Sequence, residues 1–200
     1  MVYVFFCMSS VPGDLQHNQS ITARDGAPNS TRSLDADMSA LAAALERFPG
    51  AVLVVGNDWP LLYDIETVRA TCSTLGRRIV NGLNVLSDTK EQAVLDFMST
   101  RPEPYLVVAS SDFEFSEITG SKRINVEGST GFDAAAQSVL VSRLQEIGYL
   151  ALRRVTSAEM LDAMSSSRHL VRARQYAAAL YAAQDEKFQV ALQSLLGKGA

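Results

Sequence analysis

The sequence VYVFFCMSSV, residues 2–11, reads as a buried first strand that runs straight into a turn of small residues. Its apolar part is short and rich in β-branched and aromatic side chains, which is typical of a strand covered on both faces. In a protein that alternates strands with helices, the turn after such a strand lies at the carboxyl edge of the sheet, where ligands bind. This stretch therefore predicts both a fold class and the place of any active site.

Two similar apolar runs and several shorter strand patterns recur along the chain and alternate with helical patterns. Strands are expected at 51–55, 77–80, 105–109 and 123–126, with 149–155 as a candidate further strand. Amphipathic helices are expected at 34–48, at 64–75, from residue 88 and at 133–147. This alternation predicts an α/β protein with a three-layer, Rossmann-like, mostly parallel sheet and helices on both faces.

Helix starts and domain limits follow from local signals. Asp64 and Asp133 are expected to cap helices, and Asp88-x-x-Glu91 and Thr156-x-x-Glu159 have the spacing of capping boxes. After the α/β domain, expected over 1–150, the remaining residues 151–200 predict a helical C-terminal extension with helices at 157–165 and 168–196.

Composition restricts the functional classes. The net charge is −4, with −7 on the first 150 residues and +3 on the last 50, so the chain as a whole is no evident nucleic-acid binder. Two cysteines, Cys7 and Cys72, cannot form a disulfide scaffold or a complete zinc site, which favours a reduced, cytoplasmic setting. No apolar run approaches the ~20 residues that cross a bilayer, so no membrane association is expected.

Three stretches carry a resemblance to a known family. They are CMSSV at 7–11; VVGNDW at 54–59 with YDIE at 63–66; and Lys90 followed by YLVVASSD at 105–112 and Gly131-Phe132. Their order and spacing over residues 2–147 resemble the HAD-like fold, and in particular the bacterial type described as the HAD domain in Swiss Army Knife RNA repair proteins.

The resemblance implies a phosphotransfer chemistry whose carboxylates this chain lacks. In the family, a strand-end aspartate attacks the phosphoryl group, a second aspartate two residues later is the general acid and base, and acids after a later strand help to hold Mg²⁺. Here the first two positions are Cys7 and Ser9. Thiols and hydroxyls are poor Mg²⁺ ligands, so no ordinary Mg²⁺-dependent phosphatase activity and no resident cofactor are expected.

The remaining family positions also differ. The phosphate-binding Ser/Thr corresponds to Gly56 or Asn57, and the paired acids correspond to 109–110 or 110–111. The resemblance implies that Lys90 is a remnant of the phosphate contact, although a solvated residue in a first helical turn is an equal alternative. Asp58 and Asp112 lie just past strand ends and either form a displaced metal site or cap the next turn, the second being favoured.

Two interpretations of the strand-end turns stay open. Cys7 is either a thiolate nucleophile assisted by Ser9, or a buried cysteine packed as a small apolar residue, which is the commoner case. Similarly, Trp59 either lines a pocket or seals the end of the sheet. The turns together predict a small, neutral cleft that binds a polar ligand without converting it; its lining comprises Ser10, Gly56, Asn57, Ser110 and Ser111.

These observations favour a HAD-like pseudo-phosphatase that acts as a binding or regulatory module. The alternative is a hydrolase or phosphotransferase of altered chemistry that uses Cys7 and Ser9 on a phosphorylated substrate, with Mg²⁺ only in that case. A third hypothesis is an RNA-associated accessory protein that binds through its basic tail. The expected partner is an unidentified protein or a second copy of the chain, bound through the C-terminal helices.

Overall fold

The computed structural model of the protein describes residues 1–8, 34–57, 59–83, 87, 89–110, 115–127 and 130–165. Its centre is a five-stranded, all-parallel sheet with the strand order β3-β2-β1-β4-β5. The strands are β1 (Val2–Cys7), β2 (Ala51–Val55), β3 (Ile79–Gly82), β4 (Tyr105–Ser110) and β5 (Arg123–Val126). The predicted α/β class is confirmed, although β3 begins later than expected.

Strand β1 lies in the middle of the sheet, paired with β2 on one side and β4 on the other. All six of its residues are buried. Its side chains alternate between two apolar clusters, with Val2, Val4 and Phe6 in one and Tyr3, Phe5 and Cys7 in the other. The continuous apolar run seen in the sequence therefore reflects burial on both faces.

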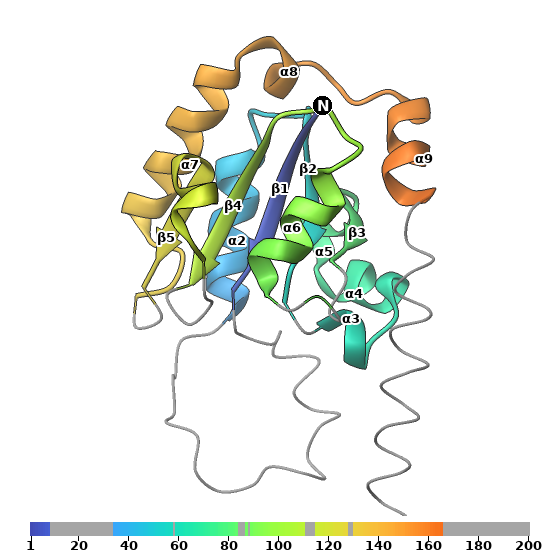
Figure 1. The fold of residues 1–200 in the computed structure, drawn as a ribbon, viewed down its shortest axis with the longest axis horizontal. Helices are drawn as coiled ribbons and strands as arrows, with labels where there is room; N and C mark the ends of the chain where they lie inside the picture. Colours follow the sequence, from blue (N-terminus) through green and yellow to red (C-terminus); the bar gives the residue numbers. More distant parts are fainter. Residues whose placement is uncertain are drawn as a thin grey trace, which may run out of the picture.

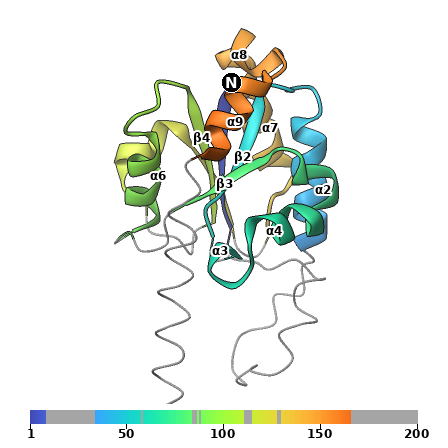
Figure 2. The same cartoon turned by 90° about the vertical axis from the view of Figure 1, so that its right-hand side faces the viewer.

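Helices cover both faces of this sheet, as Figures 1 and 2 show. The described helical segments are α2 (Leu34–Leu45), α3 (Trp59–Leu62), α4 (Ile65–Thr71), α5 (Ser73–Gly76), α6 (Lys90–Met98), the 3₁₀ helix η2 (Glu117–Lys122), α7 (Ala134–Ile147), α8 (Tyr149–Leu152) and α9 (Ser157–Ser165). The buried residues of α2, α4, α5, α7 and α8 share one cluster, and those of α6 and α9 share the other. The predicted arrangement of helices on both faces is confirmed for the described residues. None of the helices in this part of the chain is long and apolar enough to span a membrane.

Most of the predicted helix starts are found. Asp64 accepts a hydrogen bond from the backbone N–H of Thr67 and caps α4, and Asp133 caps α7 in the same way through Ala136. The cap of α6 differs from the expected one. Thr89 accepts the hydrogen bond from Gln92, and Asp88 lies outside the described residues.

Two predictions of secondary structure are wrong. The helix expected over 64–75 is divided at Cys72 into α4 and α5. The candidate strand over 149–155 is instead the helix α8, followed by extended chain at Arg153. The physical reason is that its backbone N–H groups are satisfied within the segment, by bonds from Leu152 to Gly148 and from Arg153 to Tyr149, and not by a neighbouring strand. Gly148, with φ of 71°, turns the chain from α7 into α8.

Helix α9 is fastened to the sheet at both ends. Its expected capping box is present, because Thr156 and Glu159 exchange hydrogen bonds. The Glu159 carboxylate also accepts two hydrogen bonds from Arg153 and lies 3.6 Å from the amino group of Met1. Further along, Asn81 of β3 donates to the carbonyl of Ala163 at 2.9 Å. The expected division of a helical extension from the domain at residue 150 stays a prediction, and the helix expected at 168–196 lies outside the described residues.

Candidate functional site at the carboxyl edge of the sheet

The candidate site lies where β1, β2 and β4 end. The chain proceeds from β1 outward to β3 and then returns to place β4 on the other side of β1. In doubly wound sheets, ligands bind at the carboxyl ends of the strands where the order reverses in this way. The described candidates at this edge are Cys7, Gly56, Asn57, Lys90 and Ser110. The other five candidates, Ser9, Ser10, Asp58, Ser111 and Asp112, lie outside the described residues.

Cys7 is the last residue of β1, and its side chain is fully buried. Burial raises the pKa of its thiol to about 12, and the positive charge of Lys90 opposes this rise only in part. A thiol with such a pKa is protonated at neutral pH, and the protonated form is a poor nucleophile. The surroundings of Cys7 are therefore those of a packed cysteine rather than those of an activated one.

Gly56 explains how tightly Cys7 is enclosed. A Cβ atom placed on Gly56 would lie 2.2 Å from the Cys7 sulfur and 3.1 Å from Leu83 Cδ1. The backbone of Gly56 approaches β1 closely because its N–H donates to the carbonyl of Phe6 at 2.8 Å. Only glycine allows this approach. The residue that stands at the predicted phosphate-binding position instead closes the space beside the thiol.

Asn57 connects the ends of β1 and β2. It is buried, its side-chain N–H₂ donates to the carbonyl of Met8 at 3.1 Å, and its oxygen accepts from the N–H of Trp59 at 3.2 Å. Trp59 is also buried, with its ring centroid 5.8 Å from that of Phe6. Of the two interpretations of Trp59, sealing the end of the sheet agrees with this packing.

Lys90 and Ser110 occupy the neighbouring positions. Lys90 is the first residue of α6, is half-buried, and its charge acts on Cys7. Ser110 is the buried last residue of β4, level with Val126 of β5. The structure therefore brings Cys7, Gly56 and Lys90 together, with Asn57 and Ser110 at the same edge of the sheet.

The chemistry available from these described side chains is that of binding by charge and hydrogen bonds. Their groups are one ammonium, one amide, one hydroxyl and one thiol, of which the amide is already bonded to Met8 and Trp59 and the thiol is fully buried. Within the described residues, no group of three or more His, Cys, Asp and Glu side chains is placed to hold a metal ion.

Comparisons with known proteins identify no relative of this chain. Comparison of the chain with protein-family models, with curated proteins and with solved structures gives no match. The resemblance to the HAD-like fold therefore rests on the order and spacing of the sequence stretches alone.

Two buried carboxylates were not predicted as functional from the sequence. Asp37 of α2 accepts a hydrogen bond from the N–H of Phe132 at 2.9 Å and so joins α2 to the segment before α7. Its position three residues after Leu34 and four before Leu41 places an acid on the apolar face of the helix, a signal that the sequence does contain.

Glu91 is the second of these carboxylates. It accepts hydrogen bonds from Thr119 Oγ1 at 2.6 Å and from the N–H groups of Ser116 and Thr119. Burial alone would raise the pKa of Glu91, but these hydrogen bonds outweigh it and lower the pKa to about 2. Glu91 therefore attaches η2 to α6.

Proposed function

We propose that this chain is a HAD-like domain that has lost phosphatase chemistry and acts as a binding or regulatory module. The observation that carries the proposal is the state of Cys7. At the position where the resembled family has its nucleophilic aspartate, this protein has a fully buried thiol whose pKa burial raises to about 12.

The sheet supports the first part of the proposal. The order β3-β2-β1-β4-β5 is that of a doubly wound nucleotide-binding sheet, and Cys7 ends the strand beside which that order reverses. The resemblance implies a lysine close to the nucleophile, and the charge of Lys90 does act on Cys7. This effect supports the assignment of Lys90 to the family's lysine position.

The ionisation of Cys7 argues against altered covalent chemistry. With a pKa raised by burial to about 12, the thiol is almost entirely protonated at pH 7. Covalent catalysis by cysteine needs a thiolate, which other sites obtain from a base, a cation or a helix N-terminus. Lys90 provides a cation here, but its effect on the pKa is smaller than that of burial. Binding without conversion is therefore the better supported function.

A phosphatase assay tests the loss of chemistry. The wild type, Cys7→Ala and Cys72→Ala are compared on p-nitrophenyl phosphate with Mg²⁺; Cys72→Ala is the matched control because Cys72 is the other buried cysteine. We expect no turnover above buffer from any of the three. Turnover by the wild type and by Cys72→Ala that Cys7→Ala abolishes would disprove the proposal, as would stoichiometric Mg²⁺ uptake in titration calorimetry.

Thiol labelling tests the state of Cys7 separately. In a Cys72→Ala background, an alkylating reagent at pH 8 should modify Cys7 only as fast as the protein unfolds. The labelling rate should therefore rise with urea in parallel with global unfolding. Fast labelling in the absence of urea, with a midpoint near neutral pH, would instead favour the hydrolase or phosphotransferase hypothesis.

A further inference from the structure

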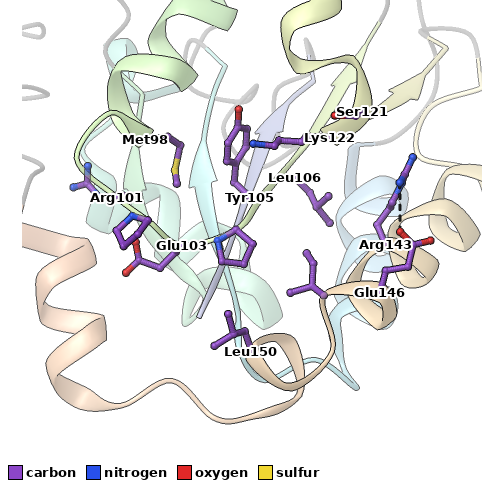
Figure 3. Close-up of a pocket in the computed structure, with 13 residues that line it drawn as sticks. Met98, Arg101, Glu103, Tyr105, Leu106, Ser121, Lys122, Arg143, Glu146 and Leu150 are labelled. Carbon is purple, nitrogen blue, oxygen red and sulfur yellow. Dashed lines mark hydrogen bonds and ion pairs between the residues drawn. The ribbon is translucent and has the colours of Figure 1, made fainter.

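A pocket of about 770 Å³ lies at the opposite edge of the sheet from the candidate site. It surrounds the start of β4 and is bounded by the ends of α6 and η2, the last turns of α7, and α8 (Figure 3). Its volume is within the range of small-molecule sites, about 300–1,000 Å³.

The register of the sheet explains why space remains there. The first paired residues of β4 and β5 are Val107 and Arg123, so Tyr105 and Leu106 extend beyond the start of β5. Successive strand residues face opposite sides, and accordingly Tyr105 belongs to the cluster under α6 and Leu106 to the cluster under α7. The pocket therefore lies around the first residues of β4, which have no β5 residue paired beside them.

The wall of this pocket on the α7 side is apolar. Leu106 of β4, Ile147 of α7 and Leu150 of α8 line it together with Pro104. Leu106 is buried, and Ile147 and Leu150 are half-buried against the same cluster. Such a surface contacts the apolar body of a ligand and gains free energy in proportion to the area removed from water.

The rim carries an excess of positive charge. Three cationic side chains, Arg101, Lys122 and Arg143, and two carboxylates, Glu103 and Glu146, are among the lining residues. Arg143 is paired with Glu146 at 3.4 Å, as the dashed line in Figure 3 shows.

Lys122 is the cation best placed to meet a ligand. Its Nζ lies 4.0 Å from the centroid of the Tyr105 ring, and Figure 3 shows the end of Lys122 beside that ring. The side chain is exposed, and no carboxylate among the residues described in the structure forms an ion pair with it. The contact with the ring holds the ammonium group in place and leaves its N–H groups available.

We propose that this pocket binds a small amphipathic anion, with an apolar body against Leu106, Ile147 and Leu150 and an acidic group on Lys122. The acidic group is a carboxylate, a phosphate or a similar oxyanion, because each accepts charge-assisted hydrogen bonds from an ammonium group. The excess of cations around the pocket disfavours a positively charged ligand. The proposal does not depend on the function proposed for the carboxyl edge.

A pair of fluorescent probes tests the proposal. The anion 8-anilinonaphthalene-1-sulfonate has the acidic group, and neutral N-phenyl-1-naphthylamine has the same ring system without it. Each is titrated into the wild type, Lys122→Met and Arg77→Met. Arg77→Met is the control because it removes the same charge from an exposed residue between α5 and β3.

We expect Lys122→Met to weaken binding of the sulfonate probe about tenfold, which corresponds to about 1.4 kcal/mol. Binding of the neutral probe should change less than twofold, and Arg77→Met should leave both affinities unchanged. Equal losses for the two probes, or equal losses in the two variants, would overturn the assignment of the acidic group to Lys122.

The position of the probe is measured independently. Backbone amide shifts in NMR spectra of the full chain should respond at Tyr105, Lys122 and Glu146 when the sulfonate probe is added, and should not respond at Gly56 or Asn57. Shifts confined to the carboxyl edge, or the absence of saturable binding by the wild type, would disprove the pocket as a site. Unfolding curves of each variant confirm that the protein stays folded.

Discussion

Gly56→Ala tests the enclosure of Cys7 most directly. The new methyl group would lie 2.2 Å from the Cys7 sulfur, 3.1 Å from Leu83 Cδ1 and 3.3 Å from the carbonyl oxygen of Phe6. The sulfur is fully buried, so a rotation that moves it away from the new methyl group would press it against other atoms of the packed core. The end of β2 must therefore shift away from β1, which strains the hydrogen bond from Gly56 to Phe6. We expect a loss of about 2–3 kcal/mol, near the upper end for an overpacked core.

A double-mutant cycle isolates the contact. Cys7→Ala removes the sulfur and leaves a small cavity, at a cost of about 1 kcal/mol. In the double variant, the new methyl group meets only Leu83 and the Phe6 carbonyl, at distances that are tight but can be relieved. The double variant should therefore be more stable than the sum of the single changes by about 1–2 kcal/mol.

Urea unfolding followed by circular dichroism measures the four free energies of the cycle. Gly120→Ala is the matched control, because its methyl group would meet only the end of the flexible Glu117 side chain, at 3.0 Å. It should change stability by less than about 1 kcal/mol. Single changes at Gly56 and Cys7 that add within about 0.5 kcal/mol would refute the reasoning, because they would show that the two groups do not touch.

Three further predictions concern buried or anchoring polar groups. Hydrogen bonds lower the pKa of Glu91 from 4.5, its ordinary value in an unfolded chain, to about 2 in the folded protein. The ionised Glu91 therefore contributes its full stabilisation above pH 4.5 and loses it as the pH falls toward 2. In Glu91→Gln, the free energy of unfolding should fall less steeply between pH 4.5 and pH 2 than in the wild type. An equally steep fall in both proteins would contradict this. Glu159→Ala should speed hydrogen exchange in α9, whereas Glu146→Ala, in a pair with exposed side chains, should not; equal exchange in both would be the contrary result. Asn57→Ala removes the hydrogen bonds to Met8 and Trp59 and should cost about 2–4 kcal/mol. The emission of Trp59, the one tryptophan in the chain, should change; an unchanged emission spectrum would count against the link.

The sequence predicted β1, β2 and β4 because each is a short, mostly apolar run between turn signals, whereas β5 alternates polar and apolar residues. The runs at 51–55 and 123–126 have the expected bounds. The segment 149–155 was misread because a short apolar run does not distinguish a strand from a buried helical turn. In the structure the bonds from Leu152 to Gly148 and from Arg153 to Tyr149 make this segment a helical turn.

The sequence predicted where the candidate site lies in the fold, but it did not predict how its side chains pack. The sequence located Cys7 and Gly56 at neighbouring strand ends, and it left open whether the thiol is reactive or buried. Their contact depends on the register between β1 and β2, which sets Phe6 beside Val55 and has no local sequence signal. Glu91 was likewise recognised as a residue of a first helical turn, but its bonds reach Thr119, which follows 28 residues later.

The central position of β1 has a consequence for synthesis on the ribosome. β1 is made first, yet one of its two neighbours, β4, pairs Leu106 with Val4 and is made about a hundred residues later. At about 5–20 residues per second, one edge of this apolar strand waits roughly 5–20 s for its partner. A nascent chain of this protein should therefore recruit a ribosome-associated chaperone until β4 has left the exit tunnel.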